Sequence, residues 1–210
     1  MKEIEKQIAK QLLQINAIKL NPAKPFTWAS GWKSPIYCDN RKTLSFPAVR
    51  SFIRDSFTEL IRNKYSDVQG IAGVATGAIA HGVLVAEKMN LPFVYIRSSA
   101  KSHGLENLIE GHCEPGQKFV VVEDLISTGG SSISAVNALR NAGCIVSGMA
   151  AIFTYGFKTS VDNFLAAKCD LDTLSNYESL VTIASEIGYI HDNEIATLKE
   201  WRLSPQTWRQ

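Results

Sequence analysis

One segment of the chain, residues 119–142, reads FVVVEDLISTGGSSISAVNALRNA and restricts the possible folds more than any other. Its first four residues are apolar and are followed at once by two carboxylates, Glu123 and Asp124. A loop of small polar residues and glycines comes next, and apolar residues then recur at helical spacing: Ile133, Val136, Leu139 and Ala142. The pattern predicts a strand, an acidic pair, a glycine-containing loop and a helix. Because the strand is continuously apolar, we expect it to be buried on both faces of a parallel sheet.

The rest of the chain alternates between strand and helix patterns. Further strands are predicted at 36–37, 68–74, 91–96, 145–153 and 171–173, and helices at 1–15, 47–63, 78–90, from 157, at 177–186 and at the tryptophan-containing C-terminus. Residues 97–117 read as a long polar loop. The alternation predicts one α/β domain over residues 1–210, with a mainly parallel sheet flanked by helices and a small N-terminal element, 1–41.

Ligands of such folds bind at the carboxyl ends of the strands. Residues 73–77, Arg97 and Glu123 all fall at predicted strand ends. We therefore expect three loops to converge on one crevice.

Composition narrows the possible partners. The 210 residues are 45% hydrophobic and 20% charged with a formal net charge of +2, so no basic face for nucleic acid is indicated. No apolar run approaches the roughly 18 residues of a membrane span, and the amphipathic start lacks the apolar core of a signal peptide. The four cysteines lack paired spacing, which favours reduced thiols. These features predict a cytoplasmic protein.

The loop after the acidic pair matches neither a Walker A motif nor a GxGxxG fingerprint. It has a purely structural interpretation, in which Ser131 or Ser132 caps the helix and Gly129 and Gly130 form a turn. That interpretation leaves the two carboxylates unexplained. Backbone N–H groups at a helix N-terminus bind anions, and carboxylates accept hydrogen bonds from sugar hydroxyls or bind Mg²⁺. The combination predicts a phosphorylated sugar as the ligand.

The sequence VVVEDLISTGGSS resembles the phosphoribosyl-pyrophosphate (PRPP) signature of type I phosphoribosyltransferases. The resemblance implies that Glu123 and Asp124 bind the ribose hydroxyls and that the loop binds the 5′-phosphate. Many members have two aspartates where this chain has Glu-Asp. The implied PRPP-binding residues of this segment are Glu123, Asp124, Leu125, Ile126, Ser127, Thr128, Gly129, Gly130 and Ser131.

Residues 70–78, GIAGVATGA, form a second run of small residues after a strand. Such residues allow either close approach of a ligand to the backbone or close packing of helix on strand, and the residues alone leave both open. In the family this segment is the pyrophosphate loop, here Ala75, Thr76 and Gly77. Some relatives carry a lysine at the position of Gly77.

Residues 97–104, RSSAKSHG, supply three basic side chains within the long loop: Arg97, Lys101 and His103. A solvated basic loop is the plain alternative, but the RxxxKxHG spacing resembles the catalytic loop of the orotate phosphoribosyltransferases. That resemblance implies a lid that closes over the active site of the neighbouring subunit in a homodimer. Arg97 and Lys101 would stabilise the leaving pyrophosphate, His103 would donate a hydrogen bond or move a proton, and Asp124 would favour the cationic sugar.

Residues 26–41 match the N-terminal pattern of the same subfamily, F-T-L-x-S-G-x-x-S-P-x-Y-x-D-x-R. The match implies a hood over the nucleobase formed within 1–41, with Ser30, Gly31, Tyr37 and Ser127 near orotate. Ala29 stands where some members have a lysine, and Tyr155 stands at or near an arginine that binds the orotate carboxylate. Backbone amides of the hood, or Ser127, would then bind that carboxylate.

The resemblance implies magnesium-dependent transfer of the 5-phosphoribosyl group from PRPP to N1 of orotate, a pentosyltransferase reaction of pyrimidine (UMP) biosynthesis. The Mg²⁺ would be held through PRPP, without direct protein ligands. Two alternatives remain: a purine-type phosphoribosyltransferase, and a PRPP-sensing regulator without catalysis. The hood pattern and the basic loop favour orotate, and no nucleic-acid or membrane partner is expected.

Overall fold

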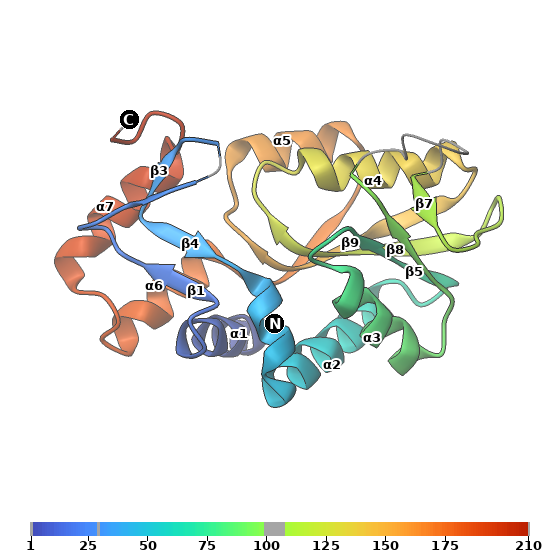
Figure 1. Cartoon of the computed structure of the whole chain (residues 1–210), viewed down its shortest axis with the longest axis horizontal. Coiled ribbons are helices and arrows are strands. Elements are labelled where there is room, and N and C mark those ends of the chain that lie inside the picture. The colour runs from blue at the N-terminus through green and yellow to red at the C-terminus, as the bar shows by residue number, and fades with distance from the viewer. Residues whose placement is uncertain (1, 29, 99–107, 210) are drawn as a thin grey trace.

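The computed structural model describes residues 2–28, 30–98 and 108–209. Its centre is a six-stranded sheet of order β10-β9-β8-β5-β6-β7 (Figure 1). The strands are β5 (Gly70–Val74), β6 (Phe93–Ile96), β7 (Ile109–Glu110), β8 (Lys118–Ile126), β9 (Ile145–Thr154) and β10 (Leu171–Asn176). All neighbouring strands pair in parallel except β6 and β7, which pair antiparallel. The predicted mainly parallel α/β sheet is confirmed.

Helices cover both faces of the sheet. On one face lie α1 (Lys2–Gln14), α2 (Pro47–Lys64) and α3 (Ile79–Met89), and on the other α4 (Gly130–Asn141) and α5 (Lys158–Ala166) (Figure 1). Strand β8 serves both layers, because Val120 and Val122 pack into one core cluster and Phe119 and Val121 into the other, each fully buried. The apolar run at the start of β8 is therefore explained as predicted, because helices cover both faces of this strand.

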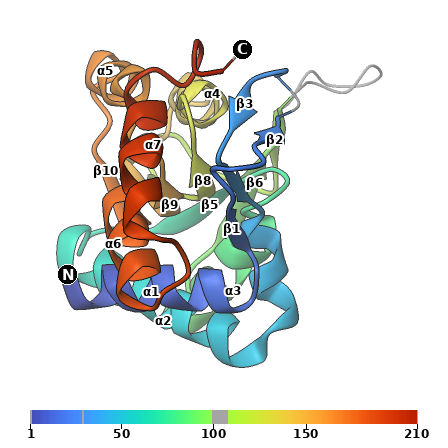
Figure 2. The ribbon, with the colours of Figure 1, turned by 90° about the vertical axis from the view of Figure 1, so that its left-hand side faces the viewer.

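A smaller layer is built from the two ends of the chain. Strands β1 (Ile18–Leu20) and β4 (Ile36–Cys38) pair antiparallel, as do β2 (Phe26–Thr27) and β3 (Lys33–Ser34). A 3₁₀ helix, η1 (Asn40–Ser45), leads from β4 into α2. Helices α6 (Tyr177–Glu186) and α7 (Asp192–Leu203) complete this layer, with the C-terminus beside the β2–β3 hairpin (Figure 2).

The structure corrects three sequence-based boundaries. The acidic pair lies inside β8, which continues to Ile126, because pairing with β9 persists beyond Glu123. The long loop contains a short strand, β7, hydrogen-bonded to β6. Helix α4 is capped by Gly129, at φ +83°, and not by Ser131 or Ser132. Within the described parts of the chain, no helix combines the length and apolarity needed to span a lipid bilayer.

Candidate active site

The acidic pair and the small-residue loop face the same cavity, as their positions at strand ends predict. This cavity, of about 420 Å³, lies at the carboxyl ends of β5 and β8. Its lining includes Ala75, Thr76, Gly77, Glu123, Asp124, Leu125 and Ser131, together with Cys38 at the end of β4, Asp39 between β4 and η1, and Arg41 in η1. The crevice therefore joins both predicted PRPP-binding segments to the N-terminal layer.

Glu123 lies at the floor of the cavity and is only 4% exposed. One carboxylate oxygen, Oε1, accepts a hydrogen bond from the Asp124 backbone N–H at 3.0 Å, and Oε2 accepts one from the Ser132 hydroxyl at 2.9 Å. Burial, followed by the charge of Asp124, raises the pKa of the Glu123 carboxyl well above its usual value. Each carboxylate oxygen still has a lone pair for a ligand hydroxyl.

Asp124 is less buried and lies against Gly77. A Cβ atom at Gly77 would come within 2.4 Å of Oδ2 of Asp124. Burial also raises the pKa of the Asp124 carboxyl, while the nearby Arg41 opposes this shift. The glycine is therefore required by the carboxylate that approaches it. A Cβ atom at Gly73 would lie 3.0 Å from the Ala78 carbonyl oxygen and 3.1 Å from the Phe93 ring, so close packing of helix on strand explains the small residue at this position.

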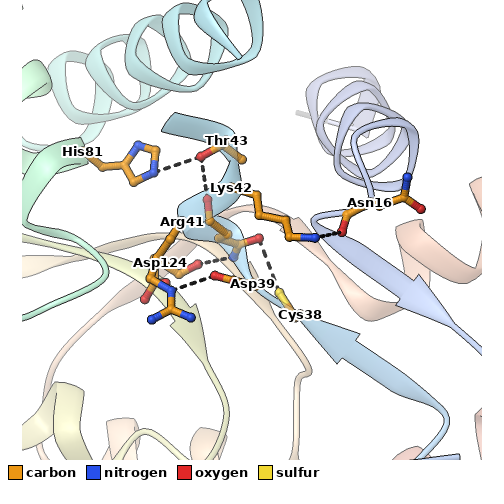
Figure 3. Close-up of polar contacts among 9 residues, drawn as sticks. Asn16, Cys38, Asp39, Arg41, Lys42, Thr43, His81 and Asp124 are labelled. Atoms are coloured by element: carbon orange, nitrogen blue, oxygen red, sulfur yellow. Dashed lines mark hydrogen bonds and ion pairs between the residues drawn. The ribbon is translucent and has the colours of Figure 1, made fainter. Parts of the chain in front are cut away.

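A buried hydrogen-bond network holds the backbone of Asp124 (Figure 3). The Asn40 amide donates to the Asp124 carbonyl oxygen at 2.6 Å, and the Thr43 hydroxyl donates to the Asn40 carbonyl oxygen at 2.6 Å. Because the Thr43 proton is used in this way, Nε2 of His81, 3.1 Å away, is the donor to Thr43. Burial lowers the pKa of His81 to about 4, so its ring is neutral near pH 7. This network fixes the acidic pair to α3 and η1.

Arg41 brings a positive charge to the same cavity. Its Nε donates to Asp39 Oδ1 at 2.7 Å, and the pair lies beside Asp124 (Figure 3). Sequence reasoning did not single out Arg41, Asn40, Thr43 or His81. For Asn40, Arg41 and Thr43, the available signal was the cluster of polar residues directly after a short strand, in CDNRKT.

The loop between β8 and α4 is held against α5. At Gly129, a Cβ atom would lie 2.9 Å from the Phe164 ring. The Thr128 carbonyl oxygen accepts a hydrogen bond from the Asn163 amide at 2.9 Å, which ties the loop to α5. Ser127 and Thr128 are partly exposed, whereas Gly130 and Ser131 are exposed. The first N–H groups of a helix have no partner within the helix, so the start of α4 is suited to bind an anion.

Arg97 lies at the rim of a neighbouring cavity of about 440 Å³ that also includes Ala75 and Thr76. Its Nη1 is 3.5 Å from Glu110 Oε1 on β7. The other two residues predicted to act in the lid, Lys101 and His103, lie outside the described residues. Arg97 is thus placed beside the predicted pyrophosphate loop.

The predicted base-contacting residues of the N-terminal layer are accessible. Ser30 and Gly31 are exposed in the β2–β3 turn, where Gly31 has φ +89° and donates to the Trp28 carbonyl oxygen. Tyr37 is 40% exposed, with its ring 5.8 Å from that of Phe26. Tyr155 is 2% exposed and packs within a cluster of aromatic rings. Ala29 lies outside the described residues.

The described side chains of the cavity do not form a complete set of metal ligands without a bound substrate. Among the described residues, no group of three or more His, Cys, Asp or Glu side chains is arranged to hold a metal ion. Two aspartates, Asp39 and Asp124, nevertheless line the cavity. Mg²⁺ commonly takes one or two carboxylates and fills its other positions with phosphate oxygens and water. The residues therefore fit a magnesium ion that is bound mainly by a phosphorylated ligand.

Comparison with known proteins agrees with this geometry. Residues 45–185 match the phosphoribosyl transferase domain family. An orotate phosphoribosyltransferase of Bacteroides fragilis is 59% identical over 99% of this chain and 98% of its own length. The chain belongs to the orotate phosphoribosyltransferase family. Another member, from Staphylococcus saprophyticus, is 55% identical over 94% of this chain and 97% of its own.

A solved structure from the same family has a similar fold. The crystal structure of orotate phosphoribosyltransferase from Aeropyrum pernix matches with a TM-score of 0.76 and 25% identity. It covers 88% of this chain and 99% of that one. The overall fold of the chain is therefore similar to that of a solved orotate phosphoribosyltransferase.

The close contact between Gly77 and Asp124 gives a first prediction. Alanine at position 77 would force the Asp124 carboxylate to move. We expect Gly77→Ala to weaken PRPP binding by about tenfold or more, since hydrogen bonds to a charged group contribute roughly 1.5–3 kcal/mol. Titration calorimetry with PRPP and Mg²⁺ measures the change. Gly116→Ala is the control for a general loss of stability: its φ of +82° strains an alanine, but a Cβ atom there meets nothing within 4 Å, so PRPP affinity should not change. Gly77→Ala with unchanged PRPP affinity would refute the assigned contact.

Proposed function

We propose that the chain is a magnesium-dependent orotate phosphoribosyltransferase that makes orotidine 5′-monophosphate and pyrophosphate from PRPP and orotate. The observation that carries the proposal is the crevice in which Glu123, Asp124 and the loop at 75–77 face one cavity. The similarity of the chain to orotate phosphoribosyltransferases, over nearly its whole length, supports the choice of reaction. We place this reaction in the cytoplasm, within pyrimidine biosynthesis.

In this proposal the acidic pair binds the ribose. Its hydroxyls donate to the remaining lone pairs of Glu123 and Asp124, while N–H groups and hydroxyls from Ser127 to Ser131 bind the 5′-phosphate. Breaking the bond between C1 and the pyrophosphate gives the sugar oxocarbenium character. The negative charge of Asp124 below the ring favours that charge distribution.

Cationic groups act on the leaving group. Arg97 lies beside the backbone of Ala75 and Thr76, and with Lys101 it stabilises the charge that develops on pyrophosphate. Bound Mg²⁺ would supply further charge neutralisation on the pyrophosphate oxygens. We assign His103 as a hydrogen-bond donor or proton carrier. Closure of the loop around Lys101 excludes water, which would otherwise hydrolyse PRPP.

The N-terminal layer covers the base in this proposal. Residues 1–41 form the hood within a single phosphoribosyltransferase domain, and Ser30, Gly31 and Tyr37 lie near the base. Their exposure on the β2–β3 turn and on β4 leaves them available to a ligand. Ser127 would contact orotate from the opposite side.

The lid is proposed to act across a homodimer. A Lys101→Ala variant and an Asp124→Asn variant, each inactive alone, are therefore expected to regain activity when mixed and allowed to exchange subunits. A mixed dimer then has one site with an intact acidic pair and an intact lid from the partner. Up to about a quarter of wild-type activity would return if such dimers form at random. No recovery, despite exchange demonstrated with tagged subunits, would contradict a shared lid.

Measuring pyrophosphate release with a panel of bases tests the reaction. We expect PRPP and Mg²⁺ to give rapid release only when orotate is added, and Asp124→Asn to abolish it. Release with hypoxanthine or adenine, but not orotate, would establish the purine-type alternative. PRPP binding without release with any base would establish the regulator.

A further inference from the structure

A second cavity lies on the other side of the phosphate loop. It has a volume of about 260 Å³ and is bounded by Trp32 of the hood, by Thr128 of the phosphate loop, and by Lys158 and Arg202. Its described lining contains these two cations and no carboxylate. The cavity therefore lies between the parts proposed to cover the base and to bind the 5′-phosphate, and its charge suits an anion.

Arg202, in the last turn of α7, is held at the end of β9 by backbone groups. Its Nε donates to the Tyr155 carbonyl oxygen at 3.1 Å and its Nη2 to the Gly156 carbonyl oxygen at 3.3 Å. Gly156 has φ +65°, and a Cβ atom there would lie 2.9 Å from Nη2. A side chain at position 156 would collide with the Arg202 guanidinium, so glycine at this position allows the guanidinium to bind these carbonyl oxygens.

This anchoring leaves one end of the guanidinium available. The two hydrogen bonds to the carbonyl oxygens are donated by Nε and Nη2, so Nη1 is the nitrogen that can serve a ligand. The other cation of the cavity, Lys158, is ion-paired with Asp162 at 2.6 Å, and its side chain is 86% exposed. Arg202 is half-buried and fixed in position, so it is the better placed of the two to hold an anionic group in a defined orientation.

Aromatic packing ties the helix that carries Arg202 to the hood. The Trp28 ring lies 5.6 Å from that of Trp201 and 5.3 Å from that of Tyr155. Beyond the helix, Nη1 of Arg209 donates to the Pro22 carbonyl oxygen at 3.0 Å. A ligand under the hood is thus close to the C-terminal segment of the chain, as well as to the sheet.

We propose that Arg202 binds the carboxylate of the acceptor base through Nη1 and thereby selects a carboxylated pyrimidine. The inference rests on the proposed function, because orotate differs from uracil only by that carboxylate. Tyr155 is buried and uncharged, since burial raises the pKa of its hydroxyl. Tyr155 therefore carries no positive charge at the end of β9. That charge comes from Arg202 of α7, about fifty residues further along the chain.

Steady-state kinetics of Arg202→Met and Arg202→Lys test the proposal. We expect the methionine variant to raise the KM for orotate by about tenfold or more, as loss of a charge-assisted hydrogen bond predicts. The KM for PRPP should stay within about twofold, since the 5′-phosphate and ribose contacts are intact. The inhibition constant of uracil, which lacks the carboxylate, should not change. Arg202→Lys should recover part of the orotate affinity.

Arg140→Met is the matched control. Arg140 also donates to two backbone carbonyl oxygens, those of Ala167 and Lys168, at 2.7 and 3.0 Å. Its loss should lower the melting temperature without changing either KM. Equal losses for orotate, PRPP and uracil in Arg202→Met would show a merely structural arginine and overturn the inference. Should that variant not fold, the same comparison in Arg202→Lys decides. Wild-type protein inactive on orotate would instead overturn the proposed function itself.

Discussion

Replacing Lys101 with alanine is expected to lower kcat by about a hundredfold or more while changing PRPP binding by less than about threefold. The reason is that pyrophosphate gains negative charge as its bond to C1 breaks, so a lid cation interacts more strongly with the transition state than with bound PRPP. Arg97, beside the pyrophosphate loop, provides charge before the lid closes. Turnover and PRPP affinity should therefore respond very differently.

Measured kcat and the PRPP dissociation constant, obtained separately, check this prediction. Lys118→Ala is the control, because Lys118 begins β8 at the opposite end of the strand and pairs with Asp67. That variant should keep both values. Equal losses in kcat and in PRPP affinity for Lys101→Ala would indicate uniform binding and contradict the assigned role.

Glutamine at position 123 is expected to weaken PRPP binding by about tenfold or more, and to stabilise the unliganded protein at pH 8. Glu123 is buried with its two oxygens already hydrogen-bonded. Its ionised form is disfavoured in the folded state by burial and by Asp124. A neutral glutamine keeps the shape and the contact with Ser132 but removes a group whose ionisation favours the unfolded chain, so stability and ligand binding change in opposite directions.

The pH dependence follows from the raised pKa of Glu123. Above the unfolded value of about 4.5, the unfolded chain loses this proton while the folded protein keeps it. Stability therefore falls as pH rises through this window, until the folded carboxyl also ionises. Ribose hydroxyls donate to the ionised form, so PRPP affinity should rise with pH over the same window. Glu123→Gln should remove both of these contributions.

Denaturant unfolding from pH 5 to pH 9, and PRPP titrations in buffers of different ionisation enthalpy, measure the two effects. Proton release on PRPP binding should be smaller in Glu123→Gln than in wild type. Ser134→Ala is the control, because its exposed hydroxyl donates to the Gly130 carbonyl oxygen within α4. Stability and PRPP affinity that both decrease in Glu123→Gln would mean that the glutamate is structural.

The sheet could be predicted from the sequence because burial on both faces leaves a continuous apolar run, as in Val120–Val122 and their neighbours. The acidic pair, the small-residue loop and the crevice could be predicted because strand ends of a parallel sheet share an edge. Strand β7 was missed because two residues, Ile109 and Glu110, give no periodicity.

Other parts of the site depend on contacts between distant segments. Asn40 reaches Asp124 across eighty-four positions and Thr43 reaches His81 across thirty-eight, and no local pattern encodes such pairs. Arg202 was overlooked for the same reason, since only folding brings the last turn of α7 to the carbonyl groups that follow β9. Helix α4 begins earlier than its serines indicated because Gly129 adopts a left-handed conformation against Phe164.

The most direct test of the central claim follows the ultraviolet absorbance of orotate with wild-type protein, Mg²⁺ and limiting PRPP. We expect orotate and PRPP to be consumed in equal amounts until PRPP is exhausted, and excess pyrophosphate to restore orotate. Constant orotate absorbance with intact PRPP, or pyrophosphate release without loss of orotate, would contradict this claim.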